Sequence, residues 1–200
     1  MKNPLFIKRF ALLFILCLPM IAYAQNPGSS LGSVTQNIAL QVNGSALLAV
    51  YNTATDATST SISMSLSGAT QAGAAISNEA TNSDTRLRIS SLVESGQFRT
   101  ITASIAPNLN STGTQFFVAL TKPNSFLPAV ANGGTPSAEQ ELTDGTEKTV
   151  VSGISTCWSG LGANDGYTVI YRYAKQENAT FLQSQNIVIT YTITDASAPV

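Results

Sequence analysis

The fold is decided by a stretch near the end of the chain, residues 186–194, which reads NIVITYTIT. Ile187, Ile189, Tyr191 and Ile193 occupy alternate positions there, and most of the residues between them are threonines. Successive side chains of a β-strand point to opposite faces of the sheet, so a period of two indicates a half-buried strand. The stretch therefore predicts a long strand with one face in an apolar core.

Similar runs recur along the chain. Residues 38–42 and 46–51 flank Asn43-Gly44, which is typical of a hairpin turn. Further strands are expected at residues 62–66, 86–93, 98–105, 115–120, 147–154 and 167–173, with a short one near residues 75 and 76. Residues 68–84 and 122–144 are otherwise expected to be long loops. About nine strands without helical periodicity predict an all-β chain folded as a single β-sandwich, Ig-like or pilin-like, with a β-barrel as the alternative.

The first 24 residues have the three parts of a secretory signal peptide. Basic residues near the start precede an apolar run over residues 10–21, and Ala22-Tyr23-Ala24 forms an A-x-A cleavage site. The apolar run is too short to span a bilayer, and no second long run follows, so no transmembrane segment is expected. We expect export to the periplasm, the cell surface or the extracellular medium.

The rest of the chain divides by composition. Residues 25–33 are small and polar and predict a flexible N-terminal tail. The β-sandwich domain is expected over residues 34–195, and residues 196–200 form a C-terminal tail. Removal of the leader leaves seven Lys and Arg against eleven Asp and Glu, a net charge of −4. Nucleic acid is therefore not expected as a partner.

The chain contains no histidine. Ser-His-Asp and Cys-His nucleophiles both need an imidazole base, so neither is available. A zinc site would have to use one cysteine and scattered carboxylates, and no phosphate-binding or dinucleotide motif is present. The sequence predicts a protein that is not an enzyme, with no catalytic residue, no metal and no cofactor.

Two local carboxylate pairs leave a glycosidase as a distant alternative. Glu139 lies near Glu141, and Glu79 lies near Asp84, all in regions expected to be loops. A catalytic pair would need a cleft and a raised pKa on one member, so solvated loop charges are the favoured interpretation. Asp165 lacks the D-x-D spacing of a calcium loop and is expected to belong to a plain turn.

The remaining candidate contacts are aromatic. Trp158 is the only tryptophan and could stack on a sugar, although a plug in the core is favoured because a large aromatic gains most from burial. Tyr167, Tyr171 and Tyr173 share one face of a strand and form either a recognition surface or, the favoured alternative, an inward stripe. Cys157 is alone after removal of the leader and is expected to be buried, with a cross-link between two chains as the alternative.

The strand rhythm of residues 186–194, with that of residues 167–173 and 38–42, resembles exported bacterial pilin-type and coat-protein-type β-sandwiches. The resemblance implies a subunit completed by a strand from its neighbour, with residues 25–42 as the candidate donor. The chain departs from chaperone-assembled pilins in lacking an intradomain disulfide and a near-terminal aromatic residue.

These observations favour a non-enzymatic secreted or cell-surface structural protein, such as a fimbrial or coat-like subunit. Its expected partners are proteins, including copies of itself. An adhesin or a carbohydrate-binding module with a glycan partner is the alternative.

Overall fold

The computed structural model describes most of the chain after residue 35. It covers residue 36 and residues 38–41, 44–56, 58, 61–69, 71–75, 77–129 and 131–196. The expected signal peptide, the expected tail at 25–33 and residues 197–200 lie outside the described residues. The chain divides into two units, Met1–Gln41 and Val42–Val200, and every strand described below belongs to the second unit.

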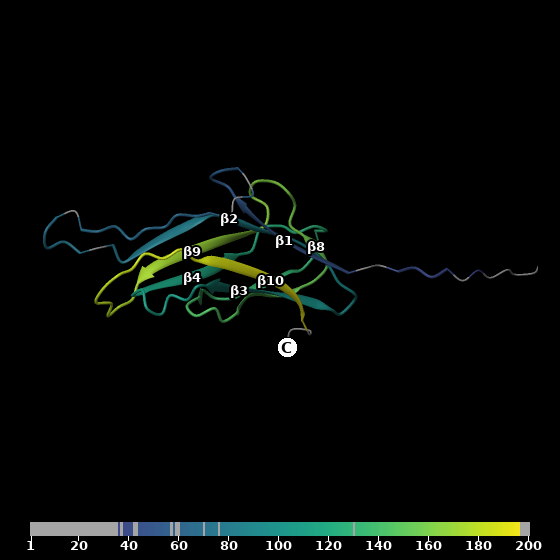
Figure 1. Cartoon of the computed structure of the whole chain (residues 1–200). Coiled ribbons are helices and arrows are strands. Elements are labelled where there is room, and N and C mark those ends of the chain that lie inside the picture. Colours follow the sequence, from purple (N-terminus) through teal and green to yellow (C-terminus); the bar gives the residue numbers. More distant parts are fainter. Residues whose placement is uncertain are drawn as a thin grey trace, which may run out of the picture. The chain divides into compact units, whose positions relative to one another are not determined.

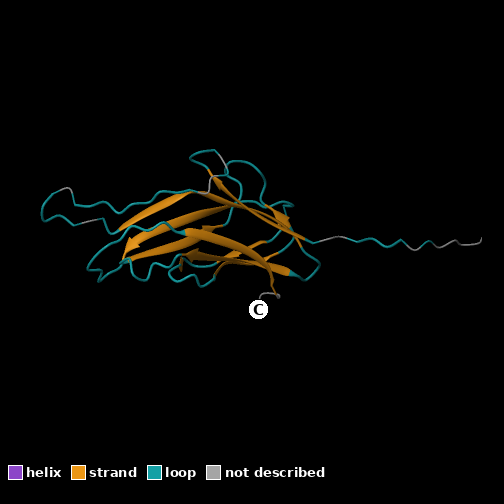
Figure 2. Cartoon of the chain, in the orientation of Figure 1, coloured by secondary structure: helices purple, strands orange, loops and turns teal. Residues whose placement is uncertain are grey.

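The second unit is a β-sandwich of two antiparallel sheets, and the described residues contain no helix (Figures 1 and 2). Its strands are β1 (Ser45–Asn52), β2 (Glu79–Leu92), β3 (Phe98–Ala106), β4 (Thr114–Thr121), β5 (Gly133–Pro136), β6 (Gln140–Glu141), β7 (Lys148–Ile154), β8 (Cys157–Trp158), β9 (Tyr167–Lys175) and β10 (Val188–Ala196). The all-β prediction and the β-sandwich are confirmed.

The strand order shows how the two layers are built. One sheet has the order β1-β2-β9-β4-β6, and the short strand β8 pairs with the last part of β2, beyond β9. The other sheet has the order β10-β3-β7-β5. Each sheet therefore begins with a strand from one end of the domain, β1 or β10, and ends with a short strand from its middle.

The core lies between the sheets and is formed by the alternating inward residues of the central strands. On β3, for example, Ile101, Ala103 and Ile105 are buried, and the residues between them are only half-buried. β4 and β9 contribute equivalent rows. The period of two in the sequence is thus the direct cause of the apolar interior, as expected for a strand with one face in the core.

Two predicted strands are wrong, and the short strand expected near residues 75 and 76 is not present at Ala75, while residue 76 lies outside the described residues. Residues 38–41 belong to no strand, and Val42 and Asn43 of the predicted hairpin lie outside the described residues. Residues 61–66 alternate in burial as predicted, and Ile62 and Met64 pack against the core, but no strand is present there. The pattern identified which side chains face inward, whereas a strand also needs a hydrogen-bonded neighbour.

The two expected loops contain strands that the sequence did not indicate. β2 begins at Glu79, inside the expected loop at 68–84, and its polar first half pairs with β9. β5 and β6 lie inside the expected loop at 122–144. These segments carry no apolar alternation. They form strands because neighbouring strands supply their hydrogen-bond partners, rather than because they bury a face of their own.

Candidate functional site

The two end strands β1 and β10 approach one another along one side of the sandwich (Figure 1). We call this line the seam. It is defined by the inward residues of the two strands, which are Leu48 and Val50 on β1 and Ile189, Tyr191 and Ile193 on β10. They pack against the core, and the seam is therefore where the apolar interior comes nearest to the edges of both sheets.

The seam residues are less covered than their neighbours one strand further in. All five are only half-buried. Their cross-strand partners on β2 and β3 are buried almost completely; these are Ile89, Leu87, Ile105, Ala103 and Ile101. Since apolar area left in contact with water contributes nothing to the hydrophobic stabilisation, the seam can gain stability from a further covering element.

Both seam strands also have an edge to which no described strand is bonded. β1 pairs with β2 and β10 pairs with β3, and within the described ranges neither has a second partner strand. An unpaired edge presents a row of backbone N–H and C=O groups that can bond to an added strand. Apolar side chains and free backbone groups thus occur together at the seam.

The opposite side of the sandwich is closed by its own loops. Leu142, next to β6, is fully buried, and its N–H donates to the carbonyl of Phe116 at 2.8 Å. The ring of Phe126 is buried against the ring of Tyr167, with centroids 5.4 Å apart. It lies so close to β5 that a Cβ atom at Gly133 would be 2.0 Å from it. Only glycine fits there, so the Phe126 ring and the backbone of β5 are in van der Waals contact on this side of the sandwich.

A pair of tyrosines joins the two sheets beneath the seam. The hydroxyl of Tyr191 on β10 donates to the hydroxyl of Tyr171 on β9 at 3.0 Å. Burial is the main cause that raises the pKa of both groups above the usual value. Tyr171 also packs against the ring of Phe116, with centroids 5.5 Å apart. The pair is neutral and acts as a structural contact between the layers.

The three tyrosines predicted as candidate contacts point into the sandwich. Tyr167 and Tyr171 are buried, and Tyr173 is half-buried against the core. The hydroxyl of Tyr167 donates to the carbonyl of Gly133, and burial raises its pKa strongly. The favoured interpretation as an inward stripe therefore holds, and these residues do not form an outer surface with Trp158.

Trp158 differs from its favoured interpretation. Its side chain is 45% exposed, so it is not a core plug. Cys157, the residue before it, is fully buried, because consecutive residues of a strand face opposite sides of the sheet. Burial raises the pKa of the Cys157 thiol to about 11, which keeps it in the protonated, unreactive form.

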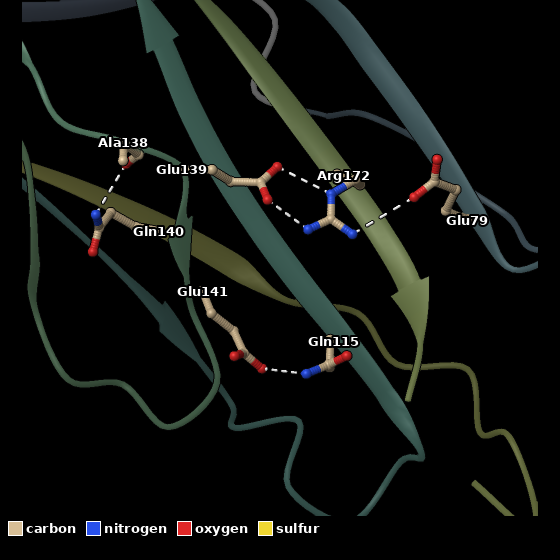
Figure 3. A network of polar contacts seen from close by, with 7 residues as sticks. All are labelled: Glu79, Gln115, Ala138, Glu139, Gln140, Glu141 and Arg172. Carbon is tan, nitrogen blue, oxygen red and sulfur yellow. Dashed lines mark hydrogen bonds and ion pairs between the residues drawn. The ribbon is translucent and has the colours of Figure 1, made fainter. Parts of the chain in front are cut away.

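Two of the four carboxylates proposed as a distant catalytic alternative, Glu139 and Glu79, belong to a charge network on the outer face of the first sheet (Figure 3), whereas Asp84 accepts a hydrogen bond from the Asn82 side chain at 2.9 Å. Both Glu139 oxygens accept hydrogen bonds from the Arg172 guanidinium, and Glu79 lies 3.6 Å from the same group. Glu141 points away from this pair and accepts a hydrogen bond from Gln115 at 2.7 Å. The network connects β2, β9 and the segment before β6.

We call this network the clamp, because its electrostatics suit a structural ion pair between strands rather than an acid catalyst. The hydrogen bond from Arg172 holds the pKa of the Glu139 carboxyl below its usual value, whereas a general acid needs a raised one. The Arg172 guanidinium also lies over the ring of Phe117, 3.8 Å from its centroid. No sequence signal could identify this cluster, because Glu139 and Arg172 are 33 residues apart.

The turn at residues 160–166 is held by its own groups and by Arg88 of β2, whose guanidinium donates to the Gly162 carbonyl at 2.8 Å. One carboxylate oxygen of Asp165 accepts the N–H of Gly162 at 2.6 Å, and the Asp165 N–H donates to the Gly162 carbonyl at 2.9 Å. Among the residues that the structure describes, no cluster of three acidic, cysteine or histidine side chains is placed to hold a metal ion. The interpretation of Asp165 as a turn residue agrees with this geometry.

The outer face of the second sheet carries hydroxyl groups in register. Three outward residues of β10 stand opposite three of β3 in the pairs Thr190–Ser104, Thr192–Thr102 and Thr194–Thr100. The two strands pair over nine residues without a bulge. Threonine suits an exposed strand face because its branched Cβ favours the extended backbone while its hydroxyl stays in water.

Comparisons of the chain with known protein families, with curated proteins and with solved structures find no match. Within the described residues, no helix is long and apolar enough to cross a membrane.

Proposed function

We propose that this chain is a non-enzymatic structural protein of the cell surface or the extracellular space, such as a fimbrial or coat-like subunit. In this proposal a strand from one copy covers the seam of the next. The observation that carries it is the coincidence of half-buried apolar residues with unpaired strand edges on β1 and β10.

The candidate covering strand is the segment before the sandwich. Ile38 and Leu40 are 68% and 90% exposed. They are separated by one residue, so in an extended strand both would face the same side. Exposed apolar residues at this spacing match a row of half-buried apolar residues at the seam of a second copy. The main-chain edge then supplies hydrogen bonds, and the two side chains supply apolar contacts.

Export is part of the same proposal. The basic start, the apolar run and the A-x-A site of residues 1–24 support secretion, and cleavage after Ala24 would leave the segment from residue 25 free to reach a neighbour. The scarcity of charged side chains, 10% of the chain, and the hydroxyl-rich outer face of the second sheet support a role in contact rather than in reaction.

The test is assembly of the secreted protein at increasing concentration. Analytical ultracentrifugation and electron microscopy should show polymers of the unmodified protein. Leu40→Lys should abolish them, because a lysine side chain at that position would place a charge on the apolar seam. Ala39→Lys is the matched control, since residue 39 faces the other way and carries the same added charge. A strictly monomeric protein at high concentration, or equal assembly of both variants, contradicts the proposal.

A further inference from the structure

The inward row of β3 begins with a charged residue at one end of the seam. Arg99 occupies this row, and the next inward residue, Ile101, is fully buried. Arg99 is paired with Asp195 of β10, two residues beyond the seam residue Ile193. The seam is therefore apolar along most of its length and charged at the end where β10 finishes.

The Arg99 guanidinium reaches from this row to the start of β1. Its Nη2 atom donates to the carbonyl of Leu92 at 3.4 Å, and Leu92 stands opposite Ser45, the first residue of β1. A Cβ atom at Gly44 would lie 3.6 Å from the same Nη2 atom. The guanidinium thus lies between the two sheets and beside both seam strands.

The residues around Arg99 do not use its full hydrogen-bonding capacity. The side chain is only 12% exposed, and its Nε atom is buried without a partner among the described residues. Its ion pair with Asp195 is a single contact of 3.4 Å, and the Asp195 side chain is 86% exposed. A guanidinium has five N–H groups, and burying them without acceptors costs free energy. An acceptor supplied by a second copy would therefore stabilise this end of the seam.

The segment proposed to cover the seam carries such an acceptor in the same row as its apolar residues. Gln36, Ile38 and Leu40 occupy alternate positions, so they face one side of an extended strand, and all three are exposed. A carboxamide has an oxygen that accepts and an NH₂ group that donates. Gln36 can therefore bond to Arg99 and to Asp195 at the same time.

One alignment of the two rows places polar groups with polar groups and apolar with apolar. It is antiparallel to β10, and its three pairs are Gln36–Asp195, Ile38–Ile193 and Leu40–Tyr191. A parallel strand would bring Gln36 to the apolar end of the seam, and a slip of two residues would place it against Ile193. Either change buries the carboxamide without a partner and leaves Arg99 without its acceptor, which costs free energy twice.

We propose that Arg99 sets the register and direction of the incoming strand. The strand of a second copy pairs with the free edge of β10 in the antiparallel direction. Its Gln36 carboxamide accepts from the Arg99 guanidinium and donates to the Asp195 carboxylate. This inference rests on the proposed assembly at the seam and adds which residues of the two copies meet. The apolar rows supply the affinity, and the polar end supplies the register.

Disulfide trapping between two copies tests the register. Copies with Ile193→Cys are mixed with copies carrying Ile38→Cys or, as the register control, Leu40→Cys, and are oxidised mildly under assembly conditions. Residues directly opposite on antiparallel strands have Cα atoms about 4.5–5.5 Å apart, within the range of a disulfide, and residues two positions away do not. Ile38→Cys should give cross-linked pairs and Leu40→Cys should not. Any other pattern in an assembling protein overturns the proposal.

A pair of substitutions shows whether Gln36 and Arg99 contact one another. Gln36→Leu should raise the concentration needed for assembly about tenfold, because the guanidinium loses its acceptor. Gln41→Leu is the matched control, since it makes the same change on the opposite face of the strand and should leave assembly unchanged. With Arg99→Met in the second copy, Gln36→Leu should no longer weaken assembly. An equal loss with and without Arg99→Met overturns the assignment of Arg99.

Two measurements separate failure of this inference from failure of the proposed function. Urea unfolding of Arg99→Met shows that the sandwich is intact before its assembly is compared. Assembly with cross-links in another register overturns the role of Arg99 and leaves the assembly itself standing. A monomeric unmodified protein at high concentration overturns both.

Discussion

The two long sides of the sandwich differ in how completely their inward apolar side chains are buried. On the side of β5 and β6, Leu142 and Phe126 are buried under the chain's own loops, and Gly133 allows contact that no other residue would permit. At the seam, inward residues such as Ile189 remain half-buried although they face the same core. One side is therefore covered by the chain's own residues, whereas the other leaves apolar residues half-buried beside strand edges to which no described strand is bonded.

Replacing a leucine by alanine on each of the two sides should give the largest difference in the free energy of unfolding. Leu142→Ala removes a fully buried side chain and should lower the free energy of unfolding by about 2–5 kcal/mol. Leu48→Ala at the seam should lower it by about 1 kcal/mol in the monomer, because that side chain is already in contact with water. Urea unfolding of both variants measures the difference. Equal losses would mean that the seam is as well packed as the opposite side.

Removing one tyrosine hydroxyl on each side should give a smaller difference in the free energy of unfolding. Tyr167→Phe leaves the Gly133 carbonyl without its donor on the closed side and should cost about 1–3 kcal/mol of stability. Tyr191→Phe at the seam removes the donor to Tyr171 and should cost about 0.5–1.5 kcal/mol. Thermal unfolding at fixed pH compares the two. A larger loss for Tyr191→Phe would show that the tyrosine pair, rather than the loops, holds the sheets together.

Removing the clamp on the outer face should have the smallest effect on the free energy of unfolding, and this effect should depend on pH. The folded protein holds the pKa of Glu139 below its unfolded value, so the stabilisation is present above the unfolded pKa and is lost as the pH falls through the folded pKa. Glu139→Gln should therefore cost at most about 1 kcal/mol at pH 7, since the pair is exposed to solvent. The difference from the unmodified protein should vanish in acid.

Glu94→Gln is the control for this measurement, because Glu94 lies in an exposed turn between β2 and β3. It changes the charge by the same amount without removing a partner of Arg172. Urea unfolding between pH 3 and pH 7 compares the two variants. A Glu139→Gln effect that persists unchanged at the lowest pH would contradict the ionic origin of the clamp.

The sequence predicted the strands that carry their own apolar alternation. β3, β7 and β9 agree with their expected positions to within two residues at each end, because each has a buried row that is visible as a period of two. β5, β6 and β8 were missed, since short strands at the margins take their structure from partners distant in the sequence. Residues 61–66 show the converse: an ideal alternation faces the core there without forming a strand.

The candidate surfaces were less predictable than the fold. Trp158 was singled out because it is the only tryptophan, but its exposure depends on the alternation that buries Cys157 and on the pairing with Ser90 and Leu127. The seam could not be inferred at all, since it requires that β1 and β10, from opposite ends of the domain, meet along one side. Pairings across more than a hundred residues leave no local mark in a single sequence.

Hydrogen–deuterium exchange on the unmodified protein, below and above its assembly concentration, tests most directly whether a second copy covers the seam. On assembly, amide exchange should slow in β1, in β10 and in residues 38–41 together, and Leu40→Lys should show no such change. Protection confined to other strands, or assembly that leaves β1, β10 and residues 38–41 exchanging as in the monomer, would contradict the account.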